Sequence, residues 1–247
     1  MRIIIIRHGD PDYAHDSLTP RGDTEAKLLA NIIDRYNIDY CYVSPLGRAQ
    51  RTAKYSLDKL GMQAETCDWL QEFPPRILRP DSGERRTVAW DWRPADWTRV
   101  PEFYDKDAWC RHPVMKEGGV DKAAAYVYEA FDSLLASHGY VKDGLIYRAV
   151  RPNHDTIAFF CHFGIECVLI GRLIGISPMQ LWHGFVAAPT GITSIRTEER
   201  RPGIASFRVD EFGATPHLMI GNITPSNRAK FIECYGDSGD GYEPDMK

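Results

Sequence analysis

Short apolar runs and longer amphipathic stretches alternate along the chain. The first run, "MRIIII", is rich in β-branched residues and contains no alternating polar residues, so it predicts a strand buried on both faces of a parallel sheet. Apolar residues at helical spacing, such as Ala26, Leu29 and Ile33, predict helices between the strands. Strands are expected over residues 1–6, 39–45, 64–70 and 155–164, helices over 18–36, 47–61, 118–139 and 165–176, and a hairpin over 191–209 with its turn in 198–203.

Residues that favour helix ends mark several of the expected helices. Thr19 is a suitable N-cap, and Pro20 suits the first helical position that follows it. Gly61 and Gly139 come directly after the last apolar positions of two other helices, where glycine commonly ends a helix. The alternation of strands and helices predicts an α/β fold with three α/β/α layers, in which helices cover both faces of a mostly parallel central sheet.

The amino-acid composition changes between residues 73 and 116. Prolines recur there, and four of the six tryptophans of the chain lie within this segment. Disordered segments are poor in aromatic residues, so we expect an ordered but irregular insertion with short helical pieces, acting as a lid or a side wall. The chain is expected to form a single α/β domain over residues 1–247, with the segment inserted into it.

Composition and charge narrow the classes of protein. The chain has 247 residues, of which 43% are hydrophobic and 26% charged, as is ordinary for a globular protein. A formal net charge of −4 argues against nucleic acid as a partner, because proteins that bind it are usually basic. The apolar runs are too short for a signal peptide or a membrane span, so no membrane partner is expected. Six cysteines without a CxxC pair suggest reduced thiols and a cytoplasmic location: Cys41, Cys67, Cys110, Cys161, Cys167 and Cys234.

Basic side chains lie where three of the expected strands end. Arg7 and His8 end the first strand, His162 ends a later strand, and Arg48 lies just inside the helix that follows the second strand. In open α/β sheets, ligands bind beyond the carboxyl ends of the strands. Imidazole and guanidinium groups around one small cavity need an anion to neutralise them. Phosphate fits that need, because arginine binds it with two parallel hydrogen bonds.

The stretch after the first strand also suggests a metal site. His8, Asp10 and Asp12 alternate, and His15 and Asp16 follow them; imidazoles and carboxylates are ligands of zinc and manganese. No matching cluster of ligands follows later in the chain, and the glycine and proline between these residues indicate a loop. We therefore expect no bound metal, with a metallophosphoesterase as the alternative.

Five short blocks occur in a fixed order along the chain. They are "RHG" after the first strand, "LTPRG", "SPLGRAQRTA", "LQE" and "CHFG". In order and rough spacing they resemble the histidine phosphatase superfamily, also called phosphoglycerate mutase-like, and the closing "ATPHL" is similar to a short element near the end of that family. "RHG" alone is a weak signal, but together with "SPLxRAxxTA" and a late strand-terminal histidine it is specific.

The resemblance implies a role for each residue of the expected site. His8 would be the nucleophile that forms a phosphohistidine, and Arg7, Arg48 and a protonated His162 would complete the phosphate pocket. Glu72, in "LQE", matches the carboxylate that protonates the leaving oxygen. A neutral imidazole is nucleophilic near pH 7, and fixed cations offset the phosphoryl charge, so no cofactor is expected.

The chain departs from the family pattern directly after "RHG". Many members read RHG-E/Q-S/T-x-x-N, whereas this chain has Asp10, Pro11 and Ala14, and so lacks a hydroxyl and an amide beside the phosphate. This departure favours the phosphatase branch: a metal-independent hydrolase of phosphate monoesters that works through phospho-His8. A phosphoglycerate mutase-type phosphotransferase and a non-catalytic protein that binds a phosphorylated ligand are the alternatives. The expected partner is a small phosphate ester or phosphate ion; the substrate and the oligomeric state stay open.

Overall fold

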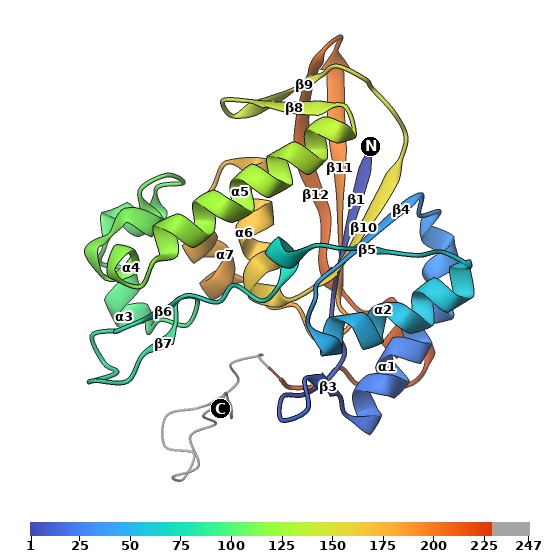
Figure 1. The fold of residues 1–247 in the computed structure, drawn as a ribbon, viewed down its shortest axis with the longest axis horizontal. Coiled ribbons are helices and arrows are strands. Elements are labelled where there is room, and N and C mark those ends of the chain that lie inside the picture. The colour runs from blue at the N-terminus through green and yellow to red at the C-terminus, as the bar shows by residue number, and fades with distance from the viewer. Residues whose placement is uncertain (229–247) are drawn as a thin grey trace.

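An eight-stranded mixed sheet lies at the centre of the computed structural model, which describes residues 1–228 (Figure 1). Its strand order is β5-β4-β10-β1-β11-β12-β9-β8. Neighbouring strands are parallel from β5 to β1 and antiparallel from β1 to β8. The strands are β1 (Arg2–Arg7), β4 (Tyr40–Val43), β5 (Glu65–Thr66), β8 (Tyr140–Asp143), β9 (Ile146–Ala149), β10 (Thr156–Cys161), β11 (Ile192–Arg201) and β12 (Ile204–Ala214).

The expectation of a mostly parallel sheet describes half of this sheet and needs correction for the other half. The predicted hairpin forms β11 and β12, and it pairs with β1 in the antiparallel direction. The hairpin of β8 and β9 was not predicted; it extends the antiparallel half further. Its strands are four residues long and mix apolar with polar residues, so they leave little periodic signal in the sequence.

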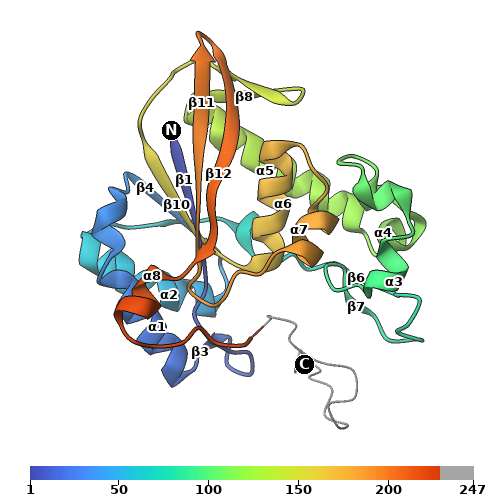
Figure 2. The ribbon, with the colours of Figure 1, turned by 180° about the vertical axis from the view of Figure 1, so that it is seen from behind.

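Helices cover both faces of the sheet (Figures 1 and 2). All four isoleucines of β1 are fully buried because successive side chains point to opposite faces, and each face has its own hydrophobic core. This explains why the run contains no alternating polar residues. One face carries α1 (Pro20–Ala30) and α2 (Gly47–Leu60), and the other carries α5 (Val120–Ser137), α6 (Phe163–Ile174) and α7 (Pro178–Gly184).

Most expected helix ends agree with the structure. Thr19 caps α1, its Oγ1 accepting the N–H of Gly22, and Pro20 is the first helical residue. Gly61 ends α2 in the left-handed conformation that glycine adopts without strain. The expected strand over 64–70 is shorter than predicted, since a 3-10 turn replaces its second half. The remaining elements are β2 (Pro11–Asp12), β3 (Ser17–Leu18), α8 (Pro216–Ile220) and the 3-10 turns η1 (Ile33–Tyr36) and η2 (Asp68–Leu70).

Residues 73–116 form an ordered, irregular segment that packs on the α5, α6 and α7 side of the sheet. Phe73 and Trp109 lie against Trp182 of α7, with ring centroids 5.7 and 5.3 Å from it. The segment is thus anchored in the core, and its role as a lid stays a prediction. It contains β6 (Arg76–Ile77), β7 (Thr87–Val88), α3 (Pro94–Trp97), η3 (Pro101–Tyr104), η4 (Trp109–Arg111) and most of α4 (Pro113–Glu117).

Candidate active site

Two histidines meet where β1 and β10 end. The parallel register of these strands pairs Arg7 with Cys161, so His8 and His162 occupy neighbouring positions just beyond the sheet. Their ring centroids lie 5.0 Å apart, and their residues are 2% and 0% exposed. The structure therefore brings together the two imidazoles that the sequence analysis placed in one pocket.

A backbone carbonyl holds His8 in one tautomer. Its Nδ1 lies 2.7 Å from the carbonyl oxygen of Gly9. A carbonyl only accepts hydrogen bonds, so Nδ1 carries the hydrogen and Nε2 keeps its lone pair. Burial lowers the pKa of His8 well below its ordinary value, and the charges of Arg7 and Arg48 lower it further. The imidazole is therefore neutral near pH 7, the form in which Nε2 is nucleophilic.

His162 makes its hydrogen bond through the opposite nitrogen. Its Nε2 lies 2.8 Å from Oγ of Ser44, which also accepts the N–H of Leu46, while Nδ1 is buried without a partner within residues 1–228. Burial, His8, Arg48 and Arg7 all lower the pKa of His162 well below its ordinary value. Without an anion the neutral form of His162 is therefore favoured. The charge of a bound phosphate would shift its pKa upward, so the protonated His162 stays a prediction for the phosphate-bound site.

Two arginines flank the imidazoles. Arg7 is 3% exposed and donates to the carbonyl of Ala187. Arg48 donates to Oδ1 of Asp16 at 2.6 Å, and the other oxygen of Asp16 accepts the N–H of Gly47 at 2.6 Å. The Nε atoms of both arginines are buried and lack a partner in the described part of the chain. Each guanidinium is therefore held in place with a donor left over.

Glu72 lies at the N-terminus of α6. Its Oε1 accepts the N–H groups of Phe73 at 2.8 Å and Ile165 at 3.1 Å. Because Oε1 accepts both, a proton on Glu72 resides on Oε2. Burial raises the pKa of this carboxyl, and the N–H of Phe73 and the charges of Arg48 and Arg7 partly oppose the rise. Glu72 therefore keeps its proton to a higher pH than an ordinary glutamate does.

The carboxylates after β1 bind protein groups. Asp10 accepts from Oγ1 of Thr19 at 2.8 Å and from Oγ of Ser226 at 2.7 Å, and Asp12 lies 2.8 Å from Nδ1 of His15. Within residues 1–228, no three His, Cys, Asp or Glu side chains gather as a metal site would require. The five cysteines described there are free and buried; Cys234 lies outside the described residues.

Several supporting residues were not predicted as such. Asp16 orients Arg48, Ser44 orients His162, and Thr52 accepts the N–H of Gly9 at 2.9 Å. Motif blocks contained two of these positions, "SPLGRAQRTA" holding both Ser44 and Thr52. The block "ATPHL" supplies His217, which lies 2.8 Å from the Thr190 hydroxyl; the N–H of Thr190 donates to the carbonyl of His8.

Known proteins resemble this chain in sequence. Residues 3–108 match the family described as the histidine phosphatase superfamily (branch 1). The adenosylcobalamin/alpha-ribazole phosphatase of Escherichia coli is 25% identical over 195 residues, covering 74% of this chain and 84% of that protein. Phosphoserine phosphatase 1 of Hydrogenobacter thermophilus is 24% identical over 237 residues, covering 89% of this chain and 100% of that protein.

Solved structures share the fold. A mutant phosphoserine phosphatase of Entamoeba histolytica, in complex with phosphoserine, has a TM-score of 0.58 at 21% identity and covers 88% of this chain and 98% of its own. A mycobacterial glucosyl-3-phosphoglycerate phosphatase has a TM-score of 0.56 at 19% identity and covers 87% and 99%. At these identities the likeness concerns the fold. The family match, which spans "RHG", "SPLGRAQRTA" and "LQE", and the sequence relatives support the histidine phosphatase superfamily and the phosphatase class of enzymes for this chain.

Proposed function

We propose that this enzyme hydrolyses small-molecule phosphate monoesters through a phosphohistidine on His8, without a bound metal. One observation supports this most strongly. Three buried nitrogens around the imidazole pair, Nε of Arg7, Nε of Arg48 and Nδ1 of His162, have no partner within residues 1–228. Buried polar groups are nearly always paired, and a phosphoryl group offers oxygens to all three.

The proposed first step transfers the phosphoryl group to His8. Nε2 of His8 attacks phosphorus, a P–N bond forms and the P–O bond to the leaving group breaks. Glu72 gives the proton on Oε2 to the leaving oxygen, so that an alcohol departs. Arg7 and Arg48 stabilise the charge on the phosphoryl oxygens from positions that Ala187 and Asp16 already hold, which avoids reorganisation during the step.

The proposed second step returns the enzyme to its starting state. Water attacks the phosphorus of phospho-His8, the P–N bond breaks, and the Glu72 carboxylate takes a proton from the water. Inorganic phosphate leaves, and His8 and Glu72 regain their original forms. The same carboxyl group therefore serves first as acid and then as base.

The substrate class follows from the names of the relatives together with the need for an acid. The relatives are named phosphoserine, alpha-ribazole and glucosyl-3-phosphoglycerate phosphatases, and these names indicate phosphorylated small molecules as their substrates. An alkoxide is a poor leaving group unless it is protonated. A carboxylic acid with a raised pKa in the site therefore supports a phosphorylated alcohol as the substrate.

Hydrolysis of p-nitrophenyl phosphate in excess EDTA tests the proposal. We expect activity that His8→Ala reduces at least about a thousandfold, because the nucleophile is lost. His154→Ala is the matched control, since His154 is exposed at the opposite end of the sheet, and it should leave the rate unchanged. Undiminished activity in His8→Ala, or loss of activity on chelation, would contradict the proposal.

A further inference from the structure

A tryptophan of the 73–116 segment lies beside Glu72. Trp90 is 9% exposed, and its indole Nε1 is fully buried without a partner within residues 1–228. A side-chain carbon on Gly164, in the first turn of α6, would lie 2.5 Å from Oε1 of Glu72 and 2.9 Å from Nε1 of Trp90. The indole N–H and the carboxyl group therefore share the space beside Gly164.

The position of its indole N–H sets Trp90 apart from the other tryptophans. Trp92 donates its N–H to the carbonyl of Ala89 at 3.1 Å, and Trp182 donates to the carbonyl of Gly164 at 2.9 Å. The N–H groups of Trp97 and Trp109 also lack a partner within residues 1–228, but it is the N–H of Trp90 that lies beside Gly164 and the carboxyl group of Glu72. A buried donor without an acceptor is costly, which calls for a state of the enzyme in which an acceptor is present.

Glu72 provides such an acceptor during the proposed reaction. In the acid form, Oε1 already receives two backbone N–H groups and Oε2 carries the proton. Once the proton has moved to the leaving oxygen, the carboxylate has about four acceptor positions, of which the backbone fills two. This charge forms in a poorly solvated place, where a further donor stabilises it more than in water.

We infer that Trp90 is a positioning residue for Glu72: its indole N–H donates to the carboxylate that forms when Glu72 protonates the leaving oxygen, and holds that carboxylate in place for the attack of water. The inference rests on the proposed function of the site. Through this one hydrogen bond, the irregular 73–116 segment would take part in the proton transfer by Glu72. Phe163, which packs edge-on against Trp90 and lies under Arg7, keeps the indole next to the pocket.

The leaving group decides how much this hydrogen bond contributes. An alkoxide needs the proton of Glu72, whereas p-nitrophenolate leaves without it. A hydrogen bond to a charged group is worth about ten- to a hundredfold in rate when it forms in the transition state. Loss of the indole N–H should therefore slow alkyl phosphates selectively, whereas a merely structural defect should slow both kinds of substrate alike.

The test compares Trp90→Phe with Trp92→Phe in the full-length enzyme. The second variant makes the same chemical change in a neighbouring buried indole whose N–H is paired with Ala89. We measure kcat/KM, which reports the phosphoryl transfer to His8, with glycerol 2-phosphate and with p-nitrophenyl phosphate. Trp90→Phe should lower the first about ten- to a hundredfold and the second less than threefold, and Trp92→Phe should show no such selectivity. Equal losses on both substrates in Trp90→Phe, or no loss on the alkyl ester, would overturn the inference.

A second variant covers the case in which Trp90→Phe folds poorly. Benzothienylalanine at position 90 keeps the shape of the indole and replaces its N–H with sulfur. The same selective loss is expected, and full activity on both esters would overturn the inference. Failure of the proposed function itself has a different signature, namely undiminished hydrolysis by His8→Ala.

Discussion

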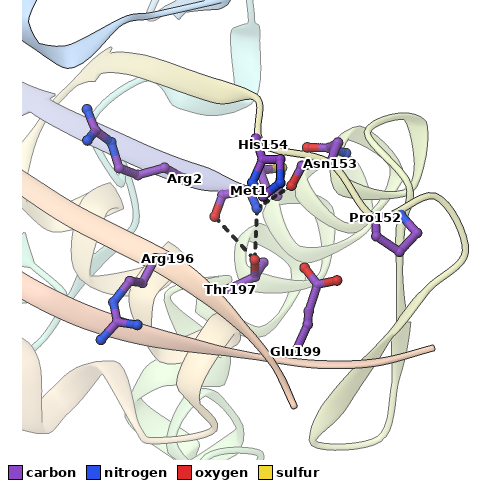
Figure 3. Close-up of a pocket in the computed structure, with 8 residues that line it drawn as sticks. All are labelled: Met1, Arg2, Pro152, Asn153, His154, Arg196, Thr197 and Glu199. Atoms are coloured by element: carbon purple, nitrogen blue, oxygen red, sulfur yellow. Dashed lines mark hydrogen bonds between the residues drawn. The ribbon is translucent and has the colours of Figure 1, made fainter. Parts of the chain in front are cut away.

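Strand β1 carries basic groups at both of its ends, but the two ends differ in burial, in hydrogen bonding and in the size of the cavity beside them. At the amino end, Met1 and Arg2 line an open cavity of about 430 Å³ together with His154, Arg196 and Glu199 (Figure 3). At the carboxyl end lies the compact site of His8. The two ends are separated by about 17 Å, the length of five strand residues.

Most of the amino-end groups are exposed or paired, although Nε of Arg2 is buried without a partner within residues 1–228. Arg196 is exposed and makes two hydrogen bonds to Asp210, at 2.8 and 3.0 Å. The terminal ammonium donates to Oγ1 of Thr197 and to the carbonyl of Asn153, and dashed lines in Figure 3 mark the hydrogen bonds around Thr197. At the carboxyl end, by contrast, the described residues place three unpaired buried nitrogens around one pair of buried imidazoles, on Arg7, Arg48 and His162. Buried basic side chains that converge on one point and keep unpaired nitrogens thus indicate a reactive site better than the volume of a cavity does.

The largest difference between the two ends should appear when one arginine is removed from each. Arg48→Ala should lower kcat/KM for a phosphate ester about a hundred- to a thousandfold, because it removes a preorganised cation from the phosphoryl oxygens. Arg196→Ala should leave the value within about twofold, since its charge is exposed and paired with Asp210. Steady-state kinetics of both variants measure this, and similar losses in the two would erase the distinction between the ends.

A smaller effect is expected from filling the space at the start of α6. A methyl group on Gly164 would lie 2.5 Å from Oε1 of Glu72, so Gly164→Ala must displace the carboxyl group. We expect a loss of about ten- to a hundredfold in kcat/KM for an alkyl phosphate. Gly184→Ala is the control, because a methyl group there meets nothing within 4 Å. Circular dichroism checks that both variants fold, and a fully active Gly164→Ala enzyme would show that Glu72 is not held as described.

The smallest effect concerns pH. Burial raises the pKa of Glu72, and the acid form is the one that donates to the leaving oxygen. As the pH rises, kcat/KM for an alkyl phosphate should therefore stay constant through the ordinary range of glutamate pKa values. At higher pH it should fall, at most about tenfold per pH unit, as Glu72 ionises. The fall should be absent with p-nitrophenyl phosphate and in Glu72→Gln. A fall of the same size with both substrates would assign it to another group.

Much of this fold could be predicted because buried parallel strands have a plain signature. The run Ile3–Ile6 is fully buried on both faces, and capping by Thr19 and Gly61 is local chemistry that neighbouring residues reveal. The hairpin of β8 and β9 was not predicted because β8 is the edge strand and β9 lies next to it, where packing constrains sequence less than at the centre of the sheet. The sheet was expected to be mostly parallel because the sequence predicts the hairpin of β11 and β12 but does not show that it pairs with β1 in the antiparallel direction.

Some residues of the candidate site could likewise be predicted from the sequence, and others could not. Arg7, His8 and His162 follow strand ends, so topology alone brings them together. Asp16 binds Arg48, and the indole of Trp90 lies beside Gly164 and Glu72. These partners are distant in sequence, and no spacing or periodicity reveals such pairs. Asp16 is therefore expected from the sequence only as a candidate metal ligand, whereas in the structure its carboxylate binds Arg48.

The most direct test of the account is to trap the covalent intermediate. The enzyme is mixed with a ³²P-labelled phosphate ester and quenched in alkali, in which phosphohistidine survives, and the labelled peptide is then sequenced. The account predicts label on His8, absent from His8→Ala and lost on treatment with acid. Turnover without any labelled enzyme, or label on a residue other than His8, would contradict it.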